Sequence, residues 1–172
     1  TKLKMMKQLI CYVAIVFAFT LANAQLNNLS KKELLDGIKF NNVSLGTIME
    51  TKGDVKKIRA LFGNNIQELS NNTGIYIGKE LYDNNIVLSF EDETGAGNSY
   101  NLTTIYVLNY FAVVNVKGLS IKKGDDKSKF KDFLFNEKYS SYNFTDADTG
   151  SVGLSFKINK YNKVSAIELI CY

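Results

Sequence analysis

Glu91, Asp92 and Glu93, followed by Gly95, Ala96 and Gly97, form the stretch whose residue types could do chemistry. Closely spaced carboxylates can act as general acid and base, and with Glu168 they make a carboxylate-based hydrolase one candidate function. A glycine-rich loop can hold a phosphate where a strand leads directly into a helix. Here an apolar, strand-like run follows instead. The stretch therefore favours an acidic hairpin loop.

Asp146, Asp148 and Gly150 form a second candidate site, because their spacing resembles the beginning of a calcium-binding loop. A full loop needs a glutamate at its twelfth position, where this chain has Lys157. Asp and Gly are also the residues that tight hairpin turns prefer. A turn is the favoured interpretation, and the sequence predicts no metal site and no cofactor.

The chain contains no histidine. This excludes Ser-His and Cys-His nucleophilic machinery, and zinc or iron sites that use histidine ligands. Only carboxylate, lysine or tyrosine chemistry remains open to an enzyme. No catalytic residue is predicted, and binding is favoured over catalysis.

The first residues resemble a secretory signal peptide. Lys2, Lys4 and Lys7 precede an uncharged run over residues 9–22, and Ala22-Asn23-Ala24 forms a small-x-small cleavage site. The run is shorter than the ~18–20 residues that span a bilayer, so no stable membrane span is expected after cleavage. We expect a signal peptide over 1–24 and one exported domain over 25–172, periplasmic or secreted.

Removal of those three lysines lowers the net charge from +4 to +1. So weak a net charge offers no electrostatic case for nucleic acid as a partner. Further along the chain, lysines between residues 117 and 131 alternate with Asp125, Asp126 and Asp132, which favours a solvated face. Cys171, the one cysteine beyond the predicted signal peptide, is expected to be a small buried hydrophobe on a strand.

Periodicity predicts the elements of a first unit. A short helix begins at Ser30, whose side chain forms a capping box with Glu33. A second helix runs from Asp54 to Gly63, because its apolar residues recur at helical spacing. Residues 41–51 are expected to be extended or irregular, and residues 67–74 are expected to form a polar loop. Strands are expected over the alternating or apolar runs 75–82, 86–92 and 102–116.

A second unit repeats this order. Leu88-Ser89-Phe90 returns as Leu154-Ser155-Phe156 about 66 residues later, each copy preceded by a Gly-Asp pair and an amphipathic segment. The second segment carries a helical stripe of Phe130, Phe133 and Leu134 and is expected to end near Asn136. The predicted fold is α+β: two tandem helix-plus-meander units, about 43–110 and 111–172, form one antiparallel sheet with short helices on one face. Its last strands are expected at 139–145, 151–158 and 164–172.

This order of a Gly-Asp helix, a Leu-Ser-Phe strand and an isoleucine-centred strand resembles the repeat of beta-lactamase-inhibitor-protein-like domains and small outer-membrane-assembly lipoproteins. The resemblance covers residues 43–172. It implies helices on one side of an antiparallel sheet and an opposite side free to bind a partner protein, without catalysis. The chain lacks the disulfides of the inhibitors and the lipidated cysteine of the lipoproteins. No binding residue is therefore carried over from the family.

Alternation along the strands predicts the open side of the sheet independently of that resemblance. If the leucines and phenylalanines of the repeated strands face the helices, the intervening residues face away. The predicted binding residues are Ser89, Thr104, Tyr106, Ser155, Lys157 and Glu168. Their mixture of aromatic, small and charged groups fits a protein-binding surface and also an ordinary solvated face.

The leading hypothesis is an exported, non-catalytic module that binds another protein of the envelope or extracellular space through this face and the hairpin loops. One alternative is binding of a small apolar or glycan ligand between helices and sheet. The other alternative, a hydrolase, is the least favoured of the three.

Overall fold

The computed structural model describes residues 27–72, 77–92, 94–95, 97 and 100–172. Three sequence predictions concern residues outside these ranges. They are the signal peptide over 1–24, the beginning of the strand predicted from residue 75, and the carboxylate Glu93 with the neighbouring Ala96.

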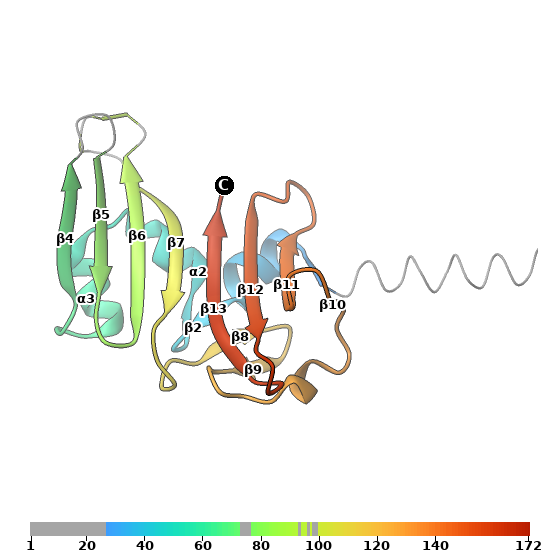
Figure 1. Ribbon diagram of the computed structural model, residues 1–172. Helices are drawn as coiled ribbons and strands as arrows, with labels where there is room; N and C mark the ends of the chain where they lie inside the picture. The colour runs from blue at the N-terminus through green and yellow to red at the C-terminus, as the bar shows by residue number, and fades with distance from the viewer. Residues whose placement is uncertain (1–26, 73–76, 93, 96, 98–99) are drawn as a thin grey trace, which may run out of the picture.

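One large sheet dominates the described part of the chain (Figure 1). Its strand order is β1-β11-β12-β13-β7-β6-β5-β4, and β10 also pairs with β11. The pairing of β1 with β11 is parallel, and the other pairs in this sheet are antiparallel. The strands are β1 (Asn28–Leu29), β4 (Gln67–Asn72), β5 (Ile77–Tyr82), β6 (Ile86–Asp92), β7 (Asn101–Val107), β10 (Phe135–Asn136), β11 (Ser141–Asp146), β12 (Val152–Ile158) and β13 (Val164–Cys171).

The repeated strings occupy matching places in this sheet. They lie on β6 and β12, which flank the central pair β7 and β13 on either side. Both strands alternate between buried and more accessible residues in the same pattern. Leu88, Phe90, Leu154 and Phe156 are fully buried, as the alternation predicts.

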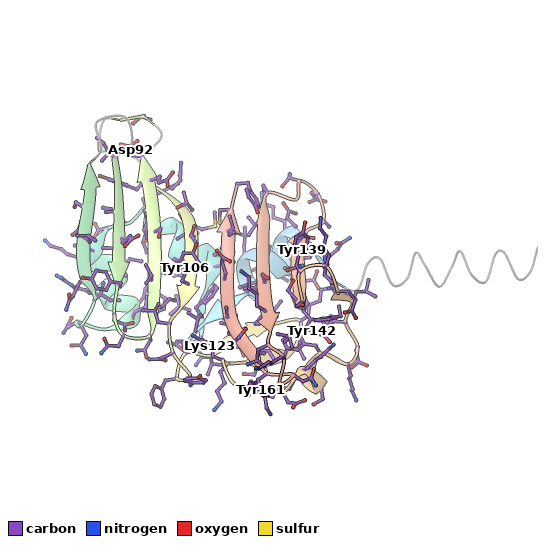
Figure 2. All side chains as sticks on the ribbon, viewed as in Figure 1. Asp92, Tyr106, Lys123, Tyr139, Tyr142 and Tyr161 are labelled. Carbon is purple, nitrogen blue, oxygen red and sulfur yellow. The ribbon has the colours of Figure 1, made fainter. Side chains whose placement is uncertain are left out.

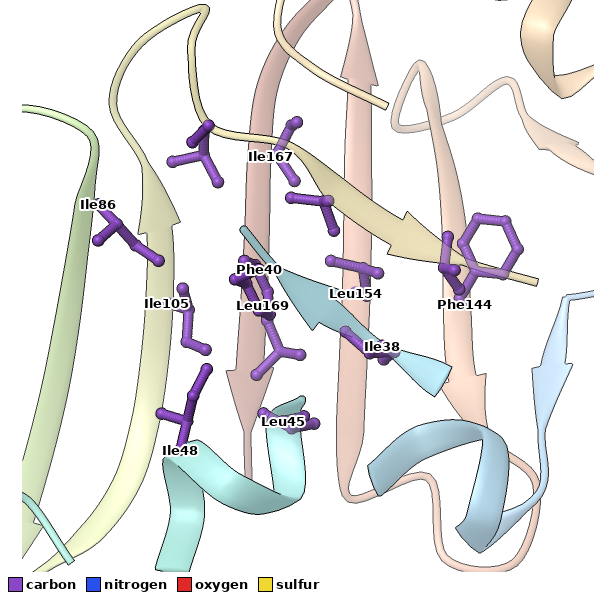
Figure 3. Close-up of a cluster of buried hydrophobic side chains, with 14 of the residues drawn as sticks. Ile38, Phe40, Leu45, Ile48, Ile86, Ile105, Phe144, Leu154, Ile167 and Leu169 are labelled. Atoms are coloured by element: carbon purple, nitrogen blue, oxygen red, sulfur yellow. The ribbon is translucent and has the colours of Figure 1, made fainter. Parts of the chain in front are cut away.

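The inner face of the sheet carries a continuous apolar row across six strands. Each member lies directly opposite the next in the strand register, and all are fully buried: Leu81, Leu88, Ile105, Leu169, Leu154 and Phe144. Figure 3 shows several of these side chains packed against Ile38, Phe40, Leu45 and Ile48 from the covering layer. Burial of this row sets which face of every central strand points inward.

Short helices and a second small sheet form the covering layer behind the large sheet in Figure 1. The helical segments are the π-helical turn η1 (Glu33–Gly37), the α-helices α2 (Leu45–Glu50) and α3 (Val55–Phe62), and the 3₁₀ turn η2 (Lys127–Phe130). The small sheet has the order β3-β2-β8-β9 and contains β2 (Lys39–Phe40), β3 (Val43–Ser44), β8 (Val114–Val116) and β9 (Leu119–Ile121). The α+β prediction is confirmed, although the helices are few and the sheet is large. The small sheet was not predicted.

Local capping explains where the predicted helices begin and end. Ser30 and Glu33 form the expected capping box, in which the Ser30 Oγ and backbone nitrogen both donate to the Glu33 carboxylate. Asp54 accepts hydrogen bonds from the backbone nitrogens at the start of α3, at 2.8 and 3.1 Å. Gly63 ends α3 with a φ of 108°, which residues with a Cβ rarely adopt. Both helix predictions are confirmed in position.

The structure corrects two predictions: a helix lies within the segment expected to be extended or irregular, and a strand lies within the expected polar loop. Residues 45–50 form α2, whose first turn is capped by the Ser44 hydroxyl, which accepts from the Thr47 nitrogen at 3.2 Å. Leu45 and Ile48 are buried one turn apart. The polar run 67–72 is the edge strand β4, paired with β5 from Gln67 to Asn72. Its residues 67–70 are exposed, so no alternation of apolar residues marked it as a strand.

Two predicted elements are shorter in the structure than the sequence suggested. The strand expected over 102–116 divides into β7 and β8, which belong to different sheets and are joined by residues 108–113. The helix expected from Phe130 to Leu134 is the single turn η2. Phe130 is fully buried and the Phe133 ring lies 5.1 Å from that of Phe144, whereas Leu134 is 43% exposed. Two of the three residues of the predicted stripe therefore contact the core, although no longer helix forms. Asn136 lies in β10 and does not cap a helix.

The described residues contain no helix long and apolar enough to span a membrane.

Candidate binding face

The face of the large sheet opposite the covering layer brings five of the six predicted binding residues into two adjacent rows. Tyr106 lies directly opposite Glu168, and Glu168 lies opposite Ser155. In the next row, Ser89 lies opposite Thr104. These residues come from four different strands, so only the strand pairing places them together. In Figure 1 the front of β6, β7, β13 and β12 is uncovered.

Lys157, the sixth predicted residue, extends this surface. It follows Ser155 by two positions on β12, so it shares the face and lies roughly 7 Å further along the strand. Lys157 is exposed, whereas Ser89, Thr104, Ser155 and Glu168 are half-buried among their neighbours. We call these six residues the open face.

Tyr106 is the most prominent member of the open face, with 43% of its surface exposed (Figure 2). A hydrogen bond to Glu168 raises the pKa of Tyr106, and partial burial and the negative charges of Glu168 and Glu80 act in the same direction. The phenol therefore stays neutral over the physiological pH range. It offers a donor to the carboxylate beside it and an aromatic surface to solvent.

Sequence reasoning missed the apolar members of this surface. Val87 lies opposite Tyr106, and Ile170 lies opposite Thr104. Both are half-buried. Val87 shares its strand parity with Ser89, and Ile170 shares its parity with Glu168, so the alternation that identified the polar residues also identifies these two. They give the open face an apolar component between its polar groups.

The carboxylates considered for hydrolysis do not converge among the described residues. Asp92 is 2% exposed and accepts hydrogen bonds from the Thr94 nitrogen and hydroxyl at 2.8 and 2.6 Å. Glu91, its neighbour, is exposed on the other side of β6. Glu91 lies opposite Asn101 of β7, and Glu168 lies opposite Tyr106 of the same strand. These two positions of β7 are five residues apart, which places Glu91 and Glu168 roughly 16 Å from each other along the strand direction. Figure 2 shows Asp92 at one end of the sheet, away from Tyr106.

The residues considered for calcium form a turn. The Asp146 carboxylate accepts hydrogen bonds from the Asp148 nitrogen at 3.1 Å and from the Thr149 hydroxyl, and Gly150 has a φ of 64°. In the described residues, no group of three or more acidic, cysteine or histidine side chains is placed to hold a metal ion. Asp146 thus stabilises the hairpin between β11 and β12.

A surface hollow with a volume of about 470 Å³ lies where α3, β4 and the β5–β6 turn meet. Its lining is mostly polar: Arg59, Asn64, Asn65, Ile66, Gln67, Tyr82, Asp83, Asn84 and Asn85. Asp83 is already engaged, because its carboxylate accepts from the backbone nitrogens of Asn85 and Ile86. The hollow fits a polar ligand better than an apolar one.

Cys171 lies on the inner side of β13, opposite Val152, and packs against the core as predicted. Burial raises the pKa of its thiol to about 11. Since the thiolate is the nucleophile, native Cys171 should react with iodoacetamide at pH 8 roughly 100-fold more slowly than in the unfolded chain. Mass spectrometry over a time course measures both rates.

A matched control places a cysteine at an exposed position of the same strand. Ser165→Cys in a Cys171→Ser background puts the thiol at an exposed position of β13. This variant should react at the unfolded rate without denaturant. If native Cys171 reacts as fast as this exposed thiol, the inward placement of Cys171 is wrong.

Compared with protein-family models, curated proteins and solved structures, the chain shows no match.

Proposed function

We propose that this chain is an exported, non-catalytic module that binds another protein of the envelope or extracellular space through the open face. The observation that carries the proposal is the row of Tyr106, Glu168 and Ser155 across three adjacent strands on the uncovered side of the sheet. Tyrosine supplies a large contact area at little entropic cost, and the neighbouring carboxylate supplies a directional acceptor. The resemblance to inhibitor-like repeat domains, with helices on one side and a binding surface on the other, agrees with this use.

Rigidity supports the same proposal. β7 and β13 are central strands, paired on both edges and backed by the apolar row that contains Ile105 and Leu169. Side chains on such strands are held in position before a partner arrives, which lowers the entropic cost of association. On the open face, the apolar Val87 and Ile170 lie beside polar groups. This mixture is also typical of interfaces that form between separately folded proteins.

A photo-crosslinking experiment tests the proposal in the native host. A benzophenone amino acid at position 106 should give an adduct with a specific envelope or extracellular protein, identified by mass spectrometry. The same amino acid at position 139 is the matched control. Tyr139 is 60% exposed but lies outside the open face (Figure 2). Identical adducts from both positions, or none from position 106, would contradict the assignment.

A second experiment measures the affinity for the crosslinked partner with two double variants. Tyr106→Ala with Glu168→Ala should weaken binding of the crosslinked partner at least tenfold, because an aromatic anchor and its charged neighbour are both removed. Lys138→Ala with Tyr139→Ala removes one aromatic residue and one charge elsewhere and should bind as the wild type does. Surface plasmon resonance gives both affinities, and circular dichroism confirms that each variant is folded.

The small-ligand alternative depends on the polar hollow near Arg59 and favours a glycan over an apolar molecule. The space between helices and sheet is filled by buried side chains such as Leu45, Ile48 and Ile58. The hydrolase alternative receives no support from the described carboxylates, since Glu91, Asp92 and Glu168 do not share a cleft.

A further inference from the structure

One end of the large sheet carries exposed apolar residues on the connection between β7 and β8. Leu108, Tyr110 and Phe111 are 44%, 64% and 83% exposed. In Figure 1 this connection lies at the lower end of the sheet, beyond the end of β7. Neighbouring exposed apolar side chains on a soluble surface commonly mark a site of interaction.

Hydrogen bonds hold this connection in a defined shape. The Asn109 side chain donates to the Asn84 carbonyl at 2.8 Å and to the Asn85 Oδ1 at 2.7 Å, and it accepts from the Phe111 nitrogen at 2.8 Å. The Leu108 nitrogen donates to the Asn85 carbonyl at 2.8 Å. Ala112 is buried behind the loop. The exposure of Phe111 therefore belongs to a fixed turn.

Lysines lie over the aromatic rings at this end. The Lys123 Nζ donates to the Leu108 carbonyl at 2.9 Å and lies 5.9 Å from the Tyr110 ring centroid. The Lys160 Nζ lies 5.0 Å from the ring centroid of Tyr161, which is 69% exposed. Figure 2 shows Lys123 and Tyr161 at the same end of the sheet.

Backbone hydrogen bonds connect the two lysine–aromatic pairs. The Gly124 nitrogen donates to the Val164 carbonyl at 2.7 Å, and the Lys127 nitrogen donates to the Asn162 carbonyl at 2.8 Å. The β9–η2 segment thus lies between the two exposed loops. We call the resulting surface the lysine–aromatic end: Leu108, Tyr110, Phe111, Lys123, Lys160 and Tyr161.

The charge near this end is positive. Asp125 is paired with Lys129 at 2.8 Å, and Asp126 is paired with Lys163 at 3.1 Å. Lys122 and Lys160 are exposed in addition to these pairs. Lys123 adds a further positive charge beside Tyr110. The acidic residues of the β9–η2 segment are thus matched by lysines, and a positive excess remains.

We propose that the lysine–aromatic end binds the surface of an anionic lipid bilayer. Phe111 and Leu108 would enter the boundary between headgroups and acyl chains, Tyr110 and Tyr161 would lie at headgroup level, and the lysines would meet lipid phosphates. Tyrosine and lysine have apolar bodies and polar tips that suit this boundary. A projecting Phe111 needs a deep complementary pocket on a protein partner, whereas a bilayer accommodates it without one.

Vesicle flotation tests this proposal with the full chain. The wild type should bind vesicles of phosphatidylcholine with phosphatidylglycerol, bind phosphatidylcholine alone more weakly, and lose affinity as salt is raised. Phe111→Ser should lower the partition coefficient about tenfold, because one large apolar side chain no longer enters the bilayer. Lys122→Gln with Lys160→Gln should lower it roughly tenfold on anionic vesicles only. The intact mass of each protein verifies that the wild type and the variants begin at the same residue.

Tyr172→Ser is the matched control. Tyr172 is 86% exposed, close to Phe111 in accessibility, and it lies at the opposite end of the sheet (Figure 1). This variant should partition as the wild type does. Equal partition of the wild type and Phe111→Ser would overturn the proposal. Absence of binding to anionic vesicles would overturn it too, and would leave an acidic protein as the alternative partner.

The lipid proposal and the protein-binding proposal fail separately. They use different surfaces, since Tyr106 and Glu168 lie within the sheet and the lysine–aromatic end lies beyond it. The Tyr106→Ala, Glu168→Ala variant should therefore keep wild-type vesicle binding, and Phe111→Ser should keep the crosslink at position 106. Loss of vesicle binding in the Tyr106→Ala, Glu168→Ala variant would contradict the assignment to the lysine–aromatic end.

Discussion

Replacement of Phe156 by alanine is expected to lower the free energy of unfolding by about 3–5 kcal/mol. Phe156 is fully buried on β12, and its ring lies 5.1 Å from that of Phe130 and 5.9 Å from that of Phe144. Truncation removes apolar contact area and leaves a cavity that a sheet paired on both sides of β12 closes only in part. Urea denaturation followed by circular dichroism measures the loss.

The control for this prediction is one residue away. Ser155→Ala changes a half-buried side chain on the opposite side of the same strand and should alter stability by no more than about 0.5 kcal/mol. Comparable losses in both variants would show that β12 does not have the orientation described.

Gly53→Ala is expected to lower the free energy of unfolding by about 2–4 kcal/mol, from two separate causes. Gly53 has a φ of 67°, which costs any residue with a Cβ about 1 kcal/mol. A Cβ built there would also lie 2.7 Å from the Lys79 Cε and 3.1 Å from the Phe90 Cγ. Phe90 is fully buried, so it cannot move away without disturbing the core. Thermal and urea unfolding both report the effect.

Gly150→Ala separates the two causes. Gly150 has nearly the same φ, 64°, but a Cβ there would meet no atom within 4 Å. Gly150→Ala should lower the free energy of unfolding by about 1 kcal/mol, which is the conformational cost alone. Equal destabilisation by the two substitutions would mean that close packing at Gly53 contributes nothing.

The conformation and packing of Gly53 also explain why a glycine begins both copies of the repeated Gly-Asp pair. Gly124, the second copy, has a φ of 85°, and a Cβ there would lie 3.0 Å from the Tyr110 ring. Both glycines thus combine a positive φ with close packing. The following aspartates differ: Asp54 caps α3, whereas the cap of η2 is Asp126, one residue beyond the repeated pair. The repeated sequence therefore marks a common turn and does not specify equal helices.

Some features were predictable because their causes are local. The capping box of Ser30 and Glu33, the cap at Asp54 and the turn at Asp146 each involve residues within a few positions of one another. Alternation along residues 86–92, 152–158 and 164–171 correctly identified three strands and their inner faces. From that alternation, together with the same pattern in β7, Ser89, Tyr106, Ser155 and Glu168 could be placed on one side of the sheet.

Other features were not predictable because their causes lie far apart in the chain. Residues 67–70 of β4 are all exposed and show no alternation, and the pairing of β4 with β5 supplies the hydrogen bonds that make it a strand. The break after β7 depends on Asn109, whose side chain bonds to residues about 25 positions earlier. β2 and β3 are two-residue strands that form only within the small sheet.

The sequence by itself determined which residues of the central strands face inward, because burial alternates with a period of two along each strand. It also determined where the capped helices begin, and it excluded histidine-dependent chemistry. The tertiary structure alone decided that Tyr106 meets Glu168, since that contact requires β7 to pair with β13, about 60 residues later in the chain. It also placed Phe111 and Tyr161 at one end of the molecule. Register between distant strands depends on the packing of the whole core, and no local pattern records it.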